Sequence, residues 1–217
     1  MPGGPPIERS ALLVRTKGAE LGARRSGESG WAATASIWGL DIASETVFLG
    51  DAGLAAPSRP SRRTGIELSG ELHPVGGVRM DADLAYSRAR FRDRDPAGDR
   101  IPGAVEGVVS AGIGYQHSPS KFAELRVRYF GPRPLVEDNT VRSRASTILN
   151  TQLGYRLRNR WTVALEAFNL LDREASDVDY YYTSRLHSEP AAGITDVHTH
   201  PQEPRSLRLV VATGSLP

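Results

Sequence analysis

The amino-acid sequence predicts an all-β protein, an antiparallel up-and-down meander of about nine strands. Apolar residues recur at every second position in segment after segment, and no segment shows the 3.6-residue period of an amphipathic helix. The connections between these segments alternate between short and long. Of the 217 residues, 22 are Gly and 15 are Pro while aromatics make up only 7%, a composition typical of short strands joined by turns.

The alternating segments define the expected strands. The clearest is 78–87, where Val78, Met80 and Leu84 share one face and charged residues occupy the other. The stretch 31–49 is extended, but its pattern is blurred. The full set of expected strands is 17–25, 31–49, 66–73, 78–87, 105–116, 124–129, 149–157, 160–172 and 204–213.

The connections predict how the faces are oriented. Short turns are expected at 26–30, 74–77, 118–120 and 158–159, and long polar loops at 50–62, 92–103, 131–144 and 173–203. A soluble sandwich has no reason to alternate loop length by side, whereas an outer-membrane β-barrel has short turns at one end, long loops at the other and apolar side chains toward lipid. The sequence therefore favours the barrel type. Aromatic residues expected near strand ends, where such barrels have aromatic girdles, are Tyr86, Tyr115, Tyr129 and Trp161.

Composition excludes several other classes. No run approaches the ~18 apolar residues of a membrane-spanning helix. The net charge is +2 and the pI about 9.1, but Arg alternates with Asp and Glu along the strands, which favours a polar lined face over a nucleic-acid surface. The absence of Cys removes disulfides and thiolate chemistry. No phosphate-binding loop or catalytic triad is identifiable, so neither an enzyme nor a cofactor is expected.

Several motifs resemble one family. The segment Phe168-Asn-Leu-Leu-Asp-Arg173 resembles the signature on the penultimate strand of TonB-dependent outer-membrane receptors, and Pro204-Arg205 leads into the expected last strand, as in that family. Further stretches that are similar to the C-terminal barrel region of the family lie at 57–67, 86–91, 101–103 and 129–134. The resemblance extends from about Lys17 to Val211.

The resemblance implies a fold, a function and partners. It implies an energised importer of a scarce ligand such as a ferric siderophore, built as a barrel of roughly 22 strands around a plug. With about nine strands, this sequence is expected to be a partial barrel lacking the plug domain and unable to transport alone. The implied partners are outer-membrane lipid, the missing N-terminal barrel strands and plug, TonB through that plug, and a small-molecule or metal-chelate ligand, with no nucleic acid.

The expected domain boundaries and cellular location follow from the same interpretation of the sequence. Residues 1–16 are expected to be an irregular N-terminal segment, 17–213 the partial barrel and 214–217 an irregular tail. The expected location is the outer membrane of a Gram-negative bacterium if the protein is exported, although the sequence as written begins without a secretory signal. The alternative function is a soluble or peripheral β-sheet binding module with no transport role.

One candidate ligand site lies in the long loop 173–203. It comprises Tyr180, Tyr181, Tyr182 and Arg185. The resemblance implies that aromatic and charged residues on such a loop contact the ligand at the extracellular mouth of the barrel. The alternative is an aromatic extension of a strand above the membrane.

A candidate metal site follows in the same loop. Asp196, His198 and His200 fall on one face of an extended chain, and carboxylate and imidazole are ligands that bind Zn, Cu or Fe. The alternative is a polar external loop in which both histidines are solvated.

Overall fold

The computed structural model of the chain describes residues 13–44, 46–49, 54–57, 59–74, 76–157 and 161–213. Residues 1–12 of the expected irregular segment 1–16, the expected tail 214–217 and the expected turn 158–159 lie outside these ranges. Every regular element in the described ranges is a β-strand. No helix among these residues is long and apolar enough to cross a membrane.

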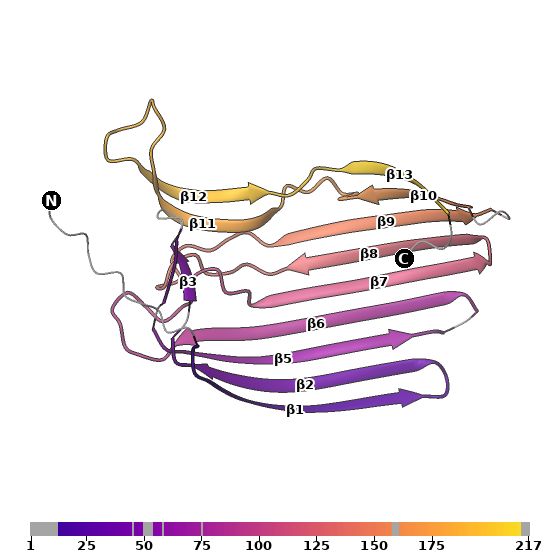
Figure 1. Cartoon of the computed structure of the whole chain (residues 1–217), viewed down its shortest axis with the longest axis horizontal. Coiled ribbons are helices and arrows are strands. Elements are labelled where there is room, and N and C mark those ends of the chain that lie inside the picture. Colours follow the sequence, from indigo (N-terminus) through magenta and orange to yellow (C-terminus); the bar gives the residue numbers. More distant parts are fainter. Residues whose placement is uncertain are drawn as a thin grey trace.

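Nine of the strands form one sheet in the order β1-β2-β5-β6-β7-β8-β9-β10-β13, in which every neighbouring pair is antiparallel (Figure 1). This confirms the predicted all-β meander. The nine strands are β1 (Thr16–Gly27), β2 (Trp31–Ile42), β5 (Ser61–Leu72), β6 (Val78–Phe91), β7 (Gly107–Ser118), β8 (Lys121–Phe130), β9 (Ser146–Arg156), β10 (Trp161–Phe168) and β13 (Ser206–Thr213).

Two further hairpins lie outside the sheet, and both correct the sequence expectation. The predicted strand 31–49 ends as β2 at Ile42, where its pairing with β1 ends at Thr16↔Ile42 and its pairing with β5 ends at Ile42↔Ser61. A separate hairpin of β3 (Thr46–Leu49) and β4 (Leu54–Pro57) follows. The expected loop 173–203 likewise contains a hairpin of β11 (Ser176–Ser184) and β12 (Ile194–Pro201).

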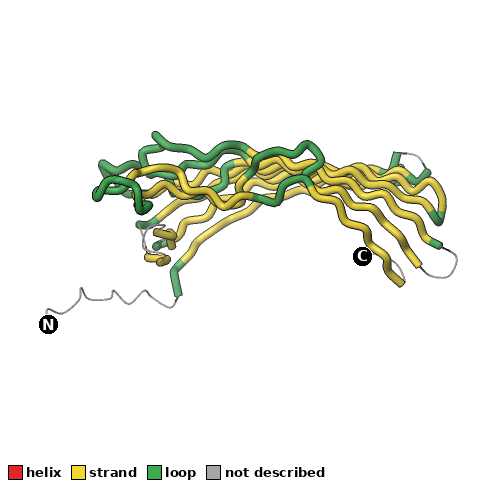
Figure 2. Tube along the Cα trace, turned by 90° about the horizontal axis from the view of Figure 1, so that it is seen from above, coloured by secondary structure: helices red, strands yellow, loops and turns green. Residues whose placement is uncertain are grey.

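The long connections gather at one end of the curved sheet and the short turns at the other (Figures 1 and 2). At the short-turn end β7 and β8 are joined across Ser118↔Lys121, and β1 and β2 across Gly27↔Trp31. The opposite end, called here the long-loop end, carries the connections 92–106 and 131–145 and the hairpin β11–β12. The alternation of connection lengths in the sequence therefore gives the sheet two different ends, one with long connections and one with short turns.

The strand register places the large apolar side chains on one face of the sheet, the apolar face. Residues directly opposed in an antiparallel pair share a face, and Leu21, Ile37 and Ile66 are opposed in succession across β1, β2 and β5. Leu165 and Leu209 are opposed at the other edge. These side chains are 45–72% exposed, so the chain itself does not cover its apolar face. Other exposed members of this face are Leu68, Met80, Leu84, Ile113, Leu125 and Leu153.

Aromatic residues of the apolar face mark both of its ends. Tyr86 opposes Gly107 near the long-loop end, while Tyr115 opposes Val78 near the short turns. Trp161, opposite Thr213, also lies at the short-turn end. The distance from Val78 to Tyr86 along β6 is about 27 Å at ~3.4 Å per residue, comparable with the apolar band of roughly 25 Å on outer-membrane barrels.

The opposite face, the polar face, is held by charged side chains that reach across strands. Arg126 of β8 reaches over β7 to Asp81 of β6, with Nη1 2.9 Å from Oδ2. It passes over Gly112, where a Cβ would lie 2.8 Å from the guanidinium. Glu166 accepts a hydrogen bond from Gln152 at 2.9 Å. Large side chains on one strand thus lie over glycines of the next, which accounts for the alternation of charge and glycine in the sequence.

We expect Gly77→Ala to destabilise the sheet and Gly76→Ala to leave it unchanged. Gly77 has φ of +80°, and a Cβ there would collide with the backbone carbonyl of Gln116, whereas nothing lies within 4 Å of a Cβ at Gly76. The left-handed backbone alone costs a non-glycine residue about 1–2 kcal/mol. Urea unfolding of the chain in dodecylmaltoside micelles, followed by tryptophan fluorescence, measures the difference. Equal midpoints for the two variants would contradict this account of the turn.

Candidate functional site

The connections at the long-loop end fold onto one another and enclose the one buried apolar cluster in the described part of the chain. Its members are Ala89, Phe91, Ile101 and Ala104, each less than 9% exposed. The first two end strand β6, and the others come from the connection 92–106. The cluster therefore anchors this connection to the end of the sheet.

Arg59 ties two of the long connections together. Its guanidinium carbon lies 4.0 Å from the centroid of the Phe91 ring, and its Nη2 donates to Glu137 at 2.9 Å. The same nitrogen donates to the carbonyl of Gly98 at 2.9 Å. Burial raises the pKa of Glu137 above its ordinary value, an effect that nearby Asp95 and Asp93 reinforce and that Arg59 opposes. The charged residues of these connections are thus structural ties between loops.

Glu106 provides a second tie between the same connections. It accepts a hydrogen bond from Arg100 at 2.9 Å and another from Arg142. Arg142 also donates to the carbonyl of Pro132 at 2.7 Å. The carboxylate at the entrance to β7 therefore fixes the positions of both 92–106 and 131–145.

A buried ion pair joins the connection 131–145 to the hairpin β11–β12. The Nη2 of Arg133 lies 2.9 Å from Oδ2 of Asp179, and their side chains are only 12% and 4% exposed. Arg133 also donates to the carbonyl of Asp177 at 2.9 Å, and Ser176 donates to Asp179 at 2.6 Å. Both oxygens of the Asp179 carboxylate therefore have partners, Arg133 for Oδ2 and Ser176 for Oδ1, so this buried charge is well paired.

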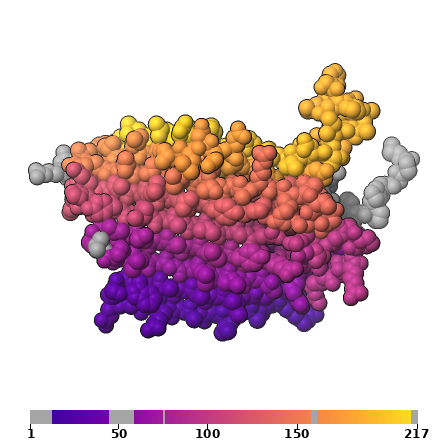
Figure 3. Space-filling view, turned by 180° about the vertical axis from the view of Figure 1, so that it is seen from behind, coloured from indigo at the N-terminus to yellow at the C-terminus, as the bar shows by residue number. Residues whose placement is uncertain are grey.

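Two of the four predicted ligand residues line a cavity beside this ion pair. Tyr180 and Tyr181 are half-buried in the wall of a depression of about 490 Å³ that Arg63, Ile101 and Arg133 also line. Tyr182 instead stacks on a histidine of β12, and Arg185 is exposed beyond the end of β11. The structure therefore divides the predicted set, and its ligand contact stays a prediction. In the space-filling view the hairpin stands out from the body of the sheet (Figure 3).

The three predicted metal ligands lie on one face of β12 but do not converge. The ring of His198 stacks on Tyr182 with centroids 3.9 Å apart, and its Nε2 lies 3.3 Å from the Tyr182 carbonyl oxygen. His200 faces Asp177, with Nδ1 3.8 Å from Oδ2, and Asp196 accepts a hydrogen bond from the backbone N–H of Val197. Among the residues that the structure describes, no three His, Cys, Asp or Glu side chains gather as metal ligands would. The metal site stays a prediction, and the observed geometry gives it no support.

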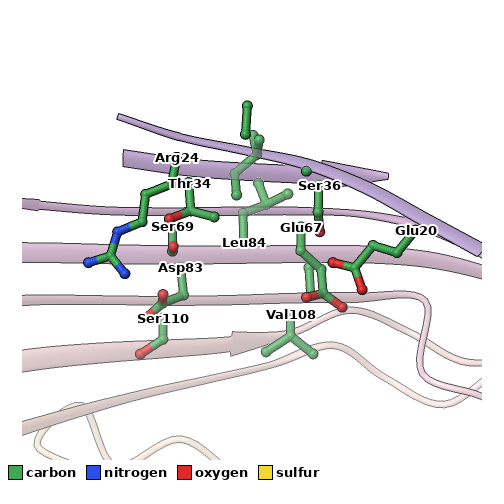
Figure 4. A pocket seen from close by; sticks show the side chains of 14 residues that line it. Glu20, Arg24, Thr34, Ser36, Glu67, Ser69, Asp83, Leu84, Val108 and Ser110 are labelled. Atoms are coloured by element: carbon green, nitrogen blue, oxygen red, sulfur yellow. The ribbon is translucent and has the colours of Figure 1, made fainter. Parts of the chain in front are cut away.

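A second depression, of about 450 Å³, lies in the polar face across the adjacent strands β1, β2, β5, β6 and β7 (Figure 4). Its rim carries the carboxylates of Glu20, Glu67 and Asp83, and Asp83 directly opposes Ser110 on the next strand. None of the predicted site residues lies here. The depression belongs to the polar lining that the sequence predicted from alternation.

The segment Phe168–Arg173 has a structural role that was not predicted from the sequence. Asn169 is 3% exposed and has φ of +46°, and its side chain exchanges two hydrogen bonds with the backbone of Arg173. Asp172, with φ of +52°, accepts a hydrogen bond from the N–H of Arg205 at 3.0 Å. Asn and Asp tolerate the left-handed backbone conformation better than other non-glycine residues. Their presence at these two positions was therefore the sequence signal that could have predicted a turn. The motif thus fixes the turn out of β10 and the entry into β13.

We expect Asp179→Asn to loosen the hairpin β11–β12. Neutralising Asp179 leaves the buried Arg133 without its partner, at a cost of about 3 kcal/mol. Hydrogen exchange of residues 176–201 in detergent micelles should quicken, because the hairpin loses its tie to 131–145. Arg205→Met is the matched control, since the Arg205–Asp172 pair at 3.5 Å is half exposed and should contribute little. Unchanged exchange in Asp179→Asn would contradict this role.

Comparison with known proteins agrees with this architecture. Residues 14–170 match the family model described as TonB dependent receptor-like, beta-barrel. The fold is similar to the ferric-catecholate import receptor Fiu from E. coli K12, at a TM-score of 0.66 and 20% identity over 90% of this chain and 27% of that one. It is also similar to the ferric yersiniabactin uptake receptor FyuA from Yersinia pestis, at 0.67 and 18% over 88% and 28%.

A third similar structure is the copper transporter OprC, with a TM-score of 0.64 and 20% identity over 88% of this chain. The chain spans 27–30% of the length of these three proteins. The family match covers more than half of the chain, from the first strand of the sheet to Leu170, just after the penultimate strand. This chain belongs to the TonB-dependent receptor β-barrel family.

Proposed function

We propose that the chain forms the C-terminal part of the β-barrel of an outer-membrane receptor for energised uptake of a scarce ligand such as a ferric siderophore. The observation that carries the proposal is the sheet itself. One face presents exposed Leu, Ile and Met side chains between aromatic residues at both ends. The other presents charged side chains that form hydrogen bonds across strands. Lipid is the natural cover for the first face and a water-filled or plugged lumen for the second.

The edges of the sheet support a dependence on further strands. Among the described residues, β1 pairs only with β2, and β13 only with β10. Each edge therefore has a row of backbone groups without a strand partner, and such groups cost several kcal/mol each in hydrocarbon. In this proposal the missing partners are N-terminal barrel strands and a plug that contacts TonB, so the chain alone does not transport.

The long-loop end is the proposed extracellular mouth. The cavity beside the Arg133–Asp179 pair opens at this end and carries Tyr180 and Tyr181 with Arg63 nearby. Aromatic rings and guanidinium groups together suit an anionic chelate with planar groups. Two of the similar structures are receptors for ferric chelates by name, and a third is a copper transporter, which supports this ligand class without selecting the metal.

Single cysteines placed in this Cys-free chain distinguish the two faces. We expect Met80→Cys and Leu84→Cys, on the apolar face, to react with a lipid-soluble maleimide and to resist a charged, water-soluble one in dodecylmaltoside micelles. Ser69→Cys and Ser110→Cys, which lie on the polar face, are the matched controls and should show the reverse. Equal access of the water-soluble reagent to both pairs would favour a soluble β-sheet binding module instead.

Uptake measurements test the predicted dependence on further strands. Supplied with a signal peptide and produced in cells that lack their ferric siderophore receptors, the chain should leave uptake of radioactive iron at background. The reason is that both sheet edges remain unpaired and no plug is present to contact TonB. The same cells producing an intact receptor provide the positive control. Uptake above background from the chain alone would contradict the proposal.

A further inference from the structure

Basic side chains gather on the apolar face just beyond its aromatic boundary at the long-loop end. On β6 the apolar face runs through Leu84 and Tyr86, and the next outward positions along the strand are Arg88 and Arg90. Arg62 directly opposes Arg90, and on its other side it opposes Asp41. We call this group the arginine cluster, with the members Lys17, Arg62, Arg88, Arg90 and Arg92.

The carboxylates around the arginine cluster neutralise only part of its charge. Asp41 accepts two hydrogen bonds from Arg62, at 2.7 and 2.9 Å, and lies 3.6 Å from Arg92. Asp99 pairs with Arg90. Arg88 is exposed and has no ion-pair partner in the part of the chain that the structure describes. Among the described residues, five basic groups thus face two acidic ones, Asp41 and Asp99, and the surplus is positive.

The cluster also has a shape that can hold a ligand. Arg62, Arg88, Arg90 and Arg92 line a depression of about 370 Å³ together with Thr64. The side chains of Arg62 and Arg92 are 58% and 47% exposed, so their donors remain accessible to a ligand. Arginine donates in a planar fork that matches the oxygens of a phosphate group.

The position of the arginine cluster next to the apolar face indicates which kind of anion it binds. The cluster continues directly from exposed Leu84 and Tyr86, so a ligand that fills it meets an apolar surface on one side and loop on the other. On the neighbouring strands of the apolar face, Gly107 of β7 opposes Tyr86, and Thr147 of β9 opposes Tyr129 of β8. These positions of β7 and β9 carry no charge, whereas the basic residues of the cluster lie on β1, β5 and β6 and just beyond the end of β6. An anionic headgroup carrying acyl chains satisfies both surfaces, whereas a free anion satisfies only one.

We infer that the arginine cluster binds the phosphate group of a membrane lipid in the leaflet at the long-loop end, with the acyl chains of that lipid lying along Leu84 and Tyr86. The inference rests on the proposed function, because it requires lipid against the apolar face. It adds to that function a specific lipid contact, which would fix the depth of the β1–β6 part of the sheet in the membrane.

The test measures lipid selectivity of the full chain in mixed micelles of dodecylmaltoside and lipid. Spin-labelled phosphatidylglycerol and spin-labelled phosphatidylcholine report how strongly each lipid associates with the protein. We expect a preference for phosphatidylglycerol. In Arg88→Gln/Arg92→Gln its association should weaken roughly 25-fold, since each of the two basic residues near an anionic surface contributes about fivefold. Association of phosphatidylcholine should stay unchanged.

The matched control is Arg79→Gln/Arg128→Gln, which removes the same charge from exposed positions of the polar face. This control variant should keep the preference for phosphatidylglycerol. An equal loss of that preference in both double variants would overturn the inference, because net charge alone would then explain the preference. Displacement of the lipid by millimolar inorganic phosphate would also overturn it in favour of a free-anion site. Water-accessible cysteines at positions 80 and 84 would refute the proposed function itself, whereas shielded cysteines without lipid preference would refute only the lipid contact.

Discussion

The register of the antiparallel sheet is the constraint on which the rest of the structure depends. Side chains alternate with a period of two, so a slip of one residue between two strands would move every Leu and Ile of one strand to the polar face. The observed pairing keeps Leu21, Ile37 and Ile66 in one row, and it places Arg126 where it can reach Asp81 across an intervening glycine. Both faces are therefore consequences of a single set of backbone hydrogen bonds.

The ties between connections depend on the same register. Because β6 and β7 are paired up to Tyr86↔Gly107, Phe91 and Glu106 reach the long-loop end together with Arg133, which follows β8. These residues then fix 92–106, 131–145 and the hairpin β11–β12 through buried or half-buried charges. A cavity at this end can thus keep its shape even though its walls come from connections far apart in sequence, which is what a ligand mouth on loops requires.

The nine-stranded order and both faces could be predicted from the sequence because alternation and loop length are local signals. The hairpins outside the sheet could not, because β11 and β12 are polar and their period is masked by three consecutive tyrosines. The Arg133–Asp179 pair was equally hidden, since its partners are 46 residues apart and neither sits in a recognisable pattern. For the predicted metal ligands, alternation correctly placed Asp196, His198 and His200 on one face. It could not reveal that Tyr182 packs on the middle imidazole.

The odd number of strands limits what can complete the barrel in the proposed receptor. In a nine-stranded antiparallel sheet the two edge strands run in the same direction, here β1 and β13. A second copy inserted in the same orientation would set β13 of one chain beside β1 of the other in parallel, so two copies could not close with antiparallel pairs alone. A complement that pairs antiparallel with both edges must itself supply an odd number of strands. The sheet geometry therefore favours a different segment of a receptor over self-association as the partner of these edges.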